Sequence, residues 1–232
     1  MGAKGNQVVI YSMTLDAAEE LAMILPVPVT TKRTEDSVQF VDLSNYEKFF
    51  PMLDRAFPLA GRATFGGSNS GAIGKPKPKL KVESVGSFDA SFVPLVSDFA
   101  RLDERFRLPE RVWNELPQFQ YHGFVVFKLK PGNRRIHPMA FAYPAKDTSK
   151  IIFPTVHIHD GKVHETAAFD HALYCQTTSR EIRMNWEEST APLGRFINAA
   201  ATKGTVIGND HVYKLSMVGD FPNEDLEVSA TE

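Results

Sequence analysis

The chain is poor in cysteine and has no long hydrophobic run. Its 232 residues include a single cysteine, Cys175, so no disulfide can form within the chain. No stretch approaches the roughly 18 consecutive apolar residues of a membrane-spanning helix. The N-terminus, MGAKGNQVV, contains no apolar signal core. These absences predict a cytoplasmic protein without a membrane span, or one whose leader has been removed.

Strong charge of either sign is also missing. Lysine and arginine number 26 and aspartate and glutamate 28, which gives a formal net charge of −2. With so small a net charge, no long-range electrostatic attraction draws the protein to nucleic acid or to an anionic membrane. The expected partner is another protein or a small molecule. The 43% hydrophobic content is ordinary for a globular protein, and seventeen phenylalanines predict a core rich in aromatic rings.

The sequence carries no complete phosphate-binding or nucleophile motif. The stretch 61–79, GRATFGGSNSGAIGKPKPK, is rich in glycine, proline and lysine. A Walker A loop fails here because Asn69 stands where glycine is needed, and Pro76 stands where serine or threonine is needed. The same Asn69 occupies the centre of GSNSG, so this is not a nucleophile elbow. We expect a flexible surface loop at 61–79, or a mobile lid or docking segment for an acidic partner.

The richest concentration of chemically versatile side chains lies at residues 151–176, IIFPTVHIHDGKVHETAAFDHALYCQ. Asp160-Gly161 is typical of a two-residue β-hairpin turn. Side chains alternate between the two faces of a strand, so this register places His157, His159 and His164 on one face. Three neutral imidazoles on one face of a hairpin lie close enough together to hold a divalent transition metal such as zinc.

The same hairpin has a simpler interpretation as an amphipathic element. Its other face carries Val156, Ile158 and Val163, which can pack on a core. The histidines would then belong to the solvated face, which they share with Lys162, a cation that repels metal. Cys175 is predicted to be a small buried hydrophobe rather than a nucleophile, because no activating partner can be placed beside it. The catalytic residues, if there are any, stay unknown at this point.

Alternating and helical patterns along the chain predict mostly strands with a few short helices. Pro26 and Pro28 lie two apart, which marks the strand that contains them as an edge strand. Ser44 to Glu47 matches a capping box, with a helix that is kinked at Pro51 or begins near it. Further helices are expected after Ser97, Pro109 and Thr190. Hairpins are expected at 80–96 and 123–143. The other expected strands are 7–15, 21–29 and 38–43 near the N-terminus and 211–218 near the C-terminus.

One resemblance adds to this reading. The segments QVVIYSM, AMILPVPV, VGSFDASFVP, LPERVWNELPQFQYHGFVVFKLK and HPMAFAYP resemble, in this order, a bacterial protein family of unknown function. The resemblance covers about Gln7 to Pro144. It implies an N-terminal hairpin with a proline-bearing strand, a second hairpin, a helix pair and a following strand. Members of that family are generally exported, and the family brings no catalytic residues.

Together these patterns predict an α+β fold. We expect a mostly antiparallel sheet, which can split into two layers, with about four short helices. Residues 1–232 are expected to form one domain with a frayed acidic tail at 222–232. The predicted function is a non-catalytic binding or interaction protein, and the alternative is a metal-binding protein or metalloenzyme that uses His157, His159 and His164.

Overall fold

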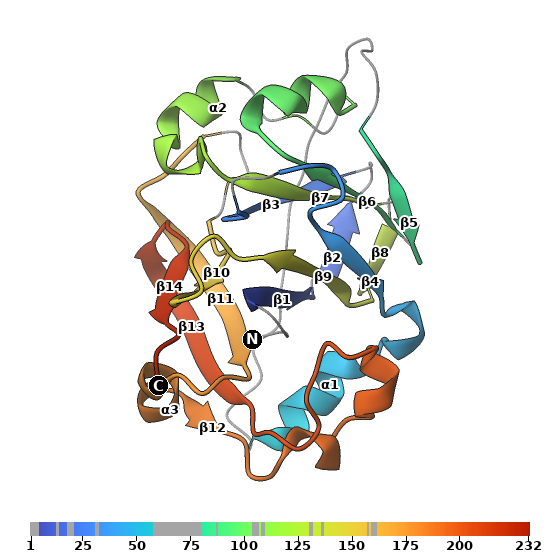
Figure 1. Cartoon of the computed structure of the whole chain (residues 1–232), viewed down its shortest axis with the longest axis vertical. Helices are drawn as coiled ribbons and strands as arrows, with labels where there is room; N and C mark the ends of the chain where they lie inside the picture. The colour runs from blue at the N-terminus through green and yellow to red at the C-terminus, as the bar shows by residue number, and fades with distance from the viewer. Residues whose placement is uncertain are drawn as a thin grey trace.

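A computed structural model describes residues 5–12, 14–17, 21–30, 33–57, 80–86, 88–103, 107, 110–129, 132–135, 137–156, 158 and 162–232. Within these residues the chain forms fourteen strands, three short α-helices and several 3₁₀ turns (Figure 1). Every ladder between named strands is antiparallel. The α+β class predicted from the sequence is confirmed. No helix in the described residues is both long enough and apolar enough to span a membrane.

Two sheets form the larger part of the molecule. One has the strand order β1-β9-β4 and the other has the order β3-β7-β6-β5. They meet at a cluster of aromatic rings, in which Phe127 contacts Phe40 and Phe141 at ring-centroid distances of 5.9 and 6.0 Å. The predicted split into two packed layers and the aromatic-rich core are both present. The strands are β1 (Asn6–Tyr11), β9 (Met139–Pro144), β4 (Gln39–Asp42), β3 (Leu21–Val27), β7 (Gly123–Leu129), β6 (Phe88–Val93) and β5 (Glu83–Val85).

Strand β7 is buried on both faces, and its sequence GFVVFKL shows why. Phe124 and Val126 point to the side covered by α2 (Glu110–Glu115) and its neighbouring turns. Val125 and Phe127 point to the opposite side, into the core between the two sheets. A run that is apolar at successive positions is what a central strand between two hydrophobic layers requires. β7 therefore holds the helical layer and both sheets together.

The remaining strands form smaller ladders beside these layers (Figure 1). The longest is the ribbon of β11 (Thr166–Cys175) and β13 (Tyr213–Pro222), which pair over ten residues. Helices α1 (Phe49–Leu53) and α3 (Arg180–Asn185) pack against two separate hydrophobic clusters. The other strands are β2 (Thr14–Ala17), β8 (Gly132–Arg135), β10 (Lys150–Phe153), β12 (Glu187–Glu188) and β14 (Leu226–Ser229). The 3₁₀ turns are Ser44–Tyr46, Asp54–Ala56, Val96–Arg101, Pro117–Phe119, Leu193–Arg195 and Ala199–Thr202.

Several strands were placed correctly but given the wrong partners. The segment 123–143 was expected to be one hairpin, yet β7 pairs with β3 and β6 while β9 pairs with β1 and β4. The connection between them forms its own strand, β8, which pairs with β2. The prediction that Pro26 and Pro28 mark an edge is confirmed, because β3 lies at the end of its sheet.

Three helix predictions need correction. The helix expected after Ser97 is a 3₁₀ turn, Val96–Arg101, which begins before Ser97 and has no side-chain cap. The capping box at Ser44 does not form, because residues 44–46 make a 3₁₀ turn without a side-chain cap. The alternative that the helix begins near Pro51 is confirmed, since α1 begins at Phe49. The helix expected after Thr190 is replaced by two 3₁₀ turns, because the chain must approach Gly208 closely there. The N–H of Gly194 donates to the carbonyl of Gly208 at 2.8 Å.

The acidic end of the chain was expected to fray but instead forms a strand. β14 pairs with β10 from Leu226 to Ser229, and Val228 is buried in a cluster with Ile151 and Ile182. The N–H of Arg180 donates to the carbonyl of Thr231 at 3.1 Å. The apolar side chains of β14 stabilise the strand although the surrounding sequence is acidic.

Candidate functional site

The predicted histidine hairpin lies only partly within the described residues. His157, His159 and the turn Asp160-Gly161 lie outside them, whereas His164 is described and exposed. The carbonyl of His164 accepts a hydrogen bond from Nδ2 of Asn223 at 3.1 Å. The described parts of both flanks, 154–156, 158 and 162–165, are not strands. The predicted cross-strand ladder is therefore absent from the part that can be seen, and the three-histidine metal site stays a prediction.

The predicted orientation of most side chains in the two flanks is confirmed. Val156, Ile158 and Val163 pack against the cluster beneath α2, as expected, while Lys162 and His164 are exposed. Thr155 is the exception, because strict alternation would place it on the face of His157, yet it is only 2% exposed.

Asp225 fixes the conformation of this segment. Its Oδ1 accepts hydrogen bonds from the N–H groups of Thr155 at 2.9 Å and Val156 at 3.2 Å. The hydroxyl of Thr155 in turn donates to the carbonyl of Glu224 at 2.8 Å. Burial raises the pKa of Asp225 to about 6. No pattern in the sequence indicated this role, because Asp225 lies in a segment that was expected to be frayed.

The described residues contain no group of three or more histidine, cysteine, aspartate or glutamate side chains arranged to hold a metal ion. The thiol of Cys175 contributes to the cluster around Ile182, and burial raises its pKa to about 12. A thiol with so high a pKa is protonated near neutral pH and is a poor nucleophile. This agrees with the prediction that Cys175 acts as a small hydrophobe.

Ser189, His211 and Glu188 lie together but do not form a catalytic triad. Nδ1 of His211 lies 3.2 Å from the hydroxyl of Ser189 and 3.5 Å from a carboxylate oxygen of Glu188. A triad needs the serine and the carboxylate on opposite nitrogens of the imidazole, whereas here both face the same one. The hydroxyl of Ser189 donates to the carbonyl of Ala191 and accepts from the N–H of Val212, and Ser189 is 3% exposed. The hydroxyl of Ser189 therefore stabilises the backbone just before β13 begins.

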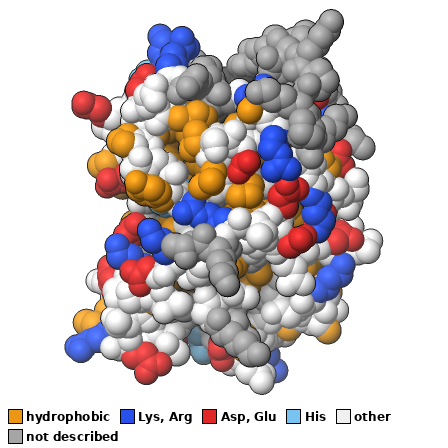
Figure 2. All heavy atoms as spheres, turned by 45° about the horizontal axis from the view of Figure 1, so that its top comes forward, with side chains coloured by type: hydrophobic (Ala, Val, Ile, Leu, Met, Phe, Trp, Pro, Cys, Tyr) orange, Lys and Arg blue, Asp and Glu red, His pale blue; other side chains and the backbone are white. Residues whose placement is uncertain are grey.

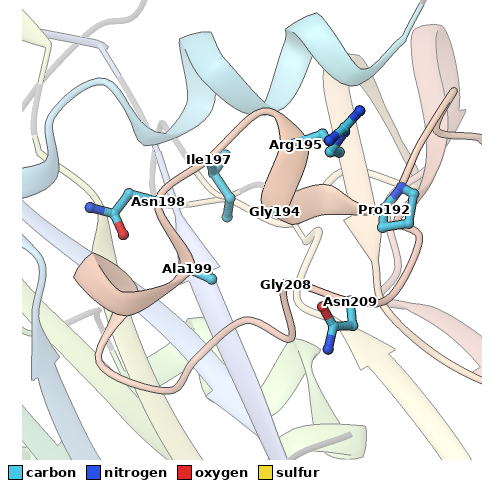
Figure 3. Close-up of a pocket in the computed structure, with 8 residues that line it drawn as sticks. All are labelled: Pro192, Gly194, Arg195, Ile197, Asn198, Ala199, Gly208 and Asn209. Carbon is cyan, nitrogen blue, oxygen red and sulfur yellow. The ribbon is translucent and has the colours of Figure 1, made fainter.

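A cavity of about 720 Å³ opens between the turns at 193–199 and the loop at 208–209 (Figure 3). Its polar side chains do not converge: Figure 3 shows Arg195, Asn198 and Asn209 pointing in different directions, away from the middle of the hollow. Small-ligand sites usually place a few polar groups so that they meet on one ligand. The glycines that line this hollow serve the close approach of two backbone segments, since a Cβ on Gly194 would lie 2.8 Å from the carbonyl oxygen of Gly208.

The outer edge of β13 is open beyond Lys214. β12 pairs only with Tyr213 and Lys214 of β13, so the outer edge of Leu215–Val218 has no strand partner among the described residues. The side chain of Val218 is 66% exposed at this edge. Gly219 follows with a φ of +118°, and Pro222 ends the strand. The edge is therefore short and bounded.

Hydrophobic side chains also gather on the end of the molecule that carries α2, with basic and acidic groups along their border (Figure 2). Outside the β13 edge, the large hydrophobic side chains most open to solvent in the described residues are Val82, Leu95, Tyr121, Met184 and Ile207.

Comparisons with known proteins give little further information. No protein-family model and no curated protein matches the chain. Solved structures that are similar include a mutated baculovirus P35 after caspase cleavage, at 13% identity and a TM-score of 0.46, over 100% of this chain and 95% of that one. A crystal structure of baculovirus P35 matches at 13% identity and a TM-score of 0.44, over 99% of this chain and 93% of that one. These values are too low to support an argument about function.

Proposed function

We propose that this protein is a non-catalytic binding protein that takes up an extended segment of a partner protein along the outer edge of β13. The observation that carries the proposal is the open edge at Leu215–Val218, with Val218 exposed beside it. An extended peptide can add to such an edge as a further strand, held by main-chain hydrogen bonds and selected by its alternate side chains.

The residues around the edge support it and limit its length, as a docking edge requires. β13 is held on its inner side by ten residue pairs with β11, so the edge is presented on a preformed ribbon. Open edges invite unwanted pairing, and proteins limit it by keeping them short or interrupting them. Gly219 and Pro222 impose such a limit here while leaving Leu215–Val218 accessible.

The test is a selection of extended peptides on the full-length protein, followed by affinity measurements on two matched variants. Val218→Asp places a charge at the edge, and we expect it to raise the Kd of selected peptides about tenfold. Ile207→Asp is the control, because Ile207 is 51% exposed and lies outside β13, where its backbone bonds to Gln176. Bound peptide should also slow amide hydrogen exchange in Leu215–Val218. Peptides that bind Val218→Asp as tightly as the parent protein, or a selection that enriches none, would overturn the proposal.

The loop at 61–79, which the sequence analysis suggested as a docking segment, lies outside the described residues. A deletion of 61–79 separates the two surfaces. If the loop binds the partner, deletion abolishes capture of the selected peptides and Val218→Asp leaves capture intact. If the β13 edge binds, the pattern is reversed.

The metal hypothesis keeps one supporting observation: Val156, Ile158 and Val163 pack inward while His164 is exposed, as the predicted alternation requires. If His157, His159 and His164 bind zinc, untagged protein will contain or take up close to one zinc per chain, and His164→Ala will reduce that uptake. Lys162→Ala is the control, since it removes a neighbouring exposed cation without removing a ligand. Protein that takes up no zinc, nickel or copper rules the site out.

A further inference from the structure

Two side-chain nitrogens in the described residues are buried without a hydrogen-bond partner: Nη1 of Arg33 and Nδ1 of His122. Buried polar atoms are nearly always hydrogen-bonded, so each exception calls for a physical explanation such as a missing ion or water. An unpaired guanidinium nitrogen is especially costly because it carries part of a full positive charge.

These two atoms come from segments that the fold brings to one place. β3 ends at Val27, opposite Gly123 of β7, and His122 immediately precedes Gly123. Beyond β3, Val29 pairs with Ala145, and the N–H of Lys146 donates to the carbonyl of Pro28 at 2.8 Å. Arg33 follows four residues after Val29. His122, Arg33 and Lys146 therefore gather at one end of the sheet.

The charge around His122 is dominated by cations. Burial lowers its pKa most, and the positive charges of Lys146 and Arg33 lower it further. Two groups act in the opposite direction: a hydrogen bond to the backbone of Gln118, and the carboxylate of Glu227, which already forms an ion pair with Lys150. Lys146 is exposed to solvent, and its charge acts on His122.

We propose that Arg33, His122 and Lys146 form a binding site for a small oxyanion such as phosphate. A hydrogen phosphate satisfies both buried nitrogens, because its oxygens accept from Arg33 and its hydroxyl donates to the neutral imidazole. Lys146 adds a mobile charge from the solvent side. The burial of both nitrogens favours a small free ion over the head group of a large ligand.

The experiment uses inorganic phosphate as the probe and sodium chloride at equal ionic strength as the reference. We expect phosphate to raise the Tm of the full-length protein and to shift the NMR signals of His122 while leaving those of His211 in place. Arg33→Gln should raise the Kd for phosphate about tenfold or more, since it removes a charge-assisted hydrogen bond.

Lys146→Gln carries the test if Arg33→Gln does not fold, because Lys146 is exposed. It should weaken phosphate binding in the same direction. Arg195→Gln is the matched control, an exposed arginine in the hollow of Figure 3, and should leave phosphate binding unchanged. The inference is overturned if phosphate has no effect beyond that of chloride, or if Arg195→Gln weakens binding as much as Lys146→Gln does. In the first case the two nitrogens are satisfied by water.

Discussion

Gly123 shows how tightly single residues are packed where the two sheets and the helical layer meet. A Cβ at this position would lie 2.3 Å from the ring of Phe92, which is 2% exposed. Gly123→Ala should therefore reduce the free energy of unfolding by about 1–3 kcal/mol, because the ring has no free space to move into. Urea unfolding measures this.

A double-mutant cycle isolates the cause of that loss. Phe92→Leu removes the ring atoms that Gly123→Ala would contact, so the double variant should lose less stability than the two single variants added together. Additive losses would show that the contact with Phe92 is not responsible.

Asp225 makes stability depend on pH in a direction opposite to that of most carboxylates. Its pKa is about 6 in the folded protein, above the ordinary value of 3.8. Between about pH 4 and pH 6 the folded state therefore keeps a proton that the unfolded state has released, and stability falls as pH rises. The full penalty, about 3 kcal/mol, is present above pH 6.

Asp225→Asn should remove this dependence. The amide oxygen can still accept from the N–H groups of Thr155 and Val156, and no charge is buried at neutral pH. We expect the parent protein to lose stability relative to Asp225→Asn as the pH of urea unfolding is raised from 4 to 7. Asp220→Asn, at an exposed position of β13, is the control. Parallel pH profiles for the parent protein and Asp225→Asn would contradict the buried carboxylate.

At the scale of elements, β14 makes the sharpest prediction because its neighbouring residues face opposite ways. Val228 is 5% exposed in the cluster of Ile151 and Ile182, so Val228→Ala should cost about 1–3 kcal/mol. Glu227 forms an exposed ion pair with Lys150, so Glu227→Ala should change stability by less than about 1 kcal/mol. If both substitutions have equal effects close to zero, the tail is frayed, as its sequence suggested, and β14 does not contribute to stability.

The elements that the sequence predicted well are those whose signal is local. The apolar run of β7 and the prolines of β3 depend on neighbouring residues, and both strands lie within segments that were expected to form strands. Strand partners were harder, because the pairing of β7 with β3 and β6 depends on residues about 30 to 100 positions away. Propensity within a segment carries no information on which distant strand completes its ladder.

The same distinction applies to the candidate sites. The inward orientation of Val156, Ile158 and Val163 followed from local alternation. The roles of Asp225, Arg33 and His122 did not, because each depends on contacts between segments distant in the sequence. The open edge of β13 could not be inferred either, since it is defined by where the short strand β12 stops.

At the scale of the whole molecule, Gln7 links two hydrophobic clusters. Its side chain donates to the carbonyl of Ile152 at 2.5 Å and accepts from the N–H of Ile152 at 3.2 Å and from the hydroxyl of Tyr143 at 3.0 Å. These bonds join the sheet of β1, β9 and β4 to the ladder of β10 and β14. Because Gln7 is 9% exposed, its replacement leaves buried partners on both sides unsatisfied.

The two tryptophans report on the two sides of this link. Trp113 packs in the cluster beneath α2, and Trp186 packs beside Ile151 and Ile182. The variants Trp113→Phe and Trp186→Phe each keep one tryptophan. In each of them we expect fluorescence and far-UV circular dichroism to change at the same urea concentration in the presence of Gln7. With Gln7→Ala added, the fluorescence of Trp186 should change at a lower urea concentration than that of Trp113. Coincident transitions in the Gln7→Ala background would show that the shared strands, rather than this buried amide, make the molecule unfold as one unit.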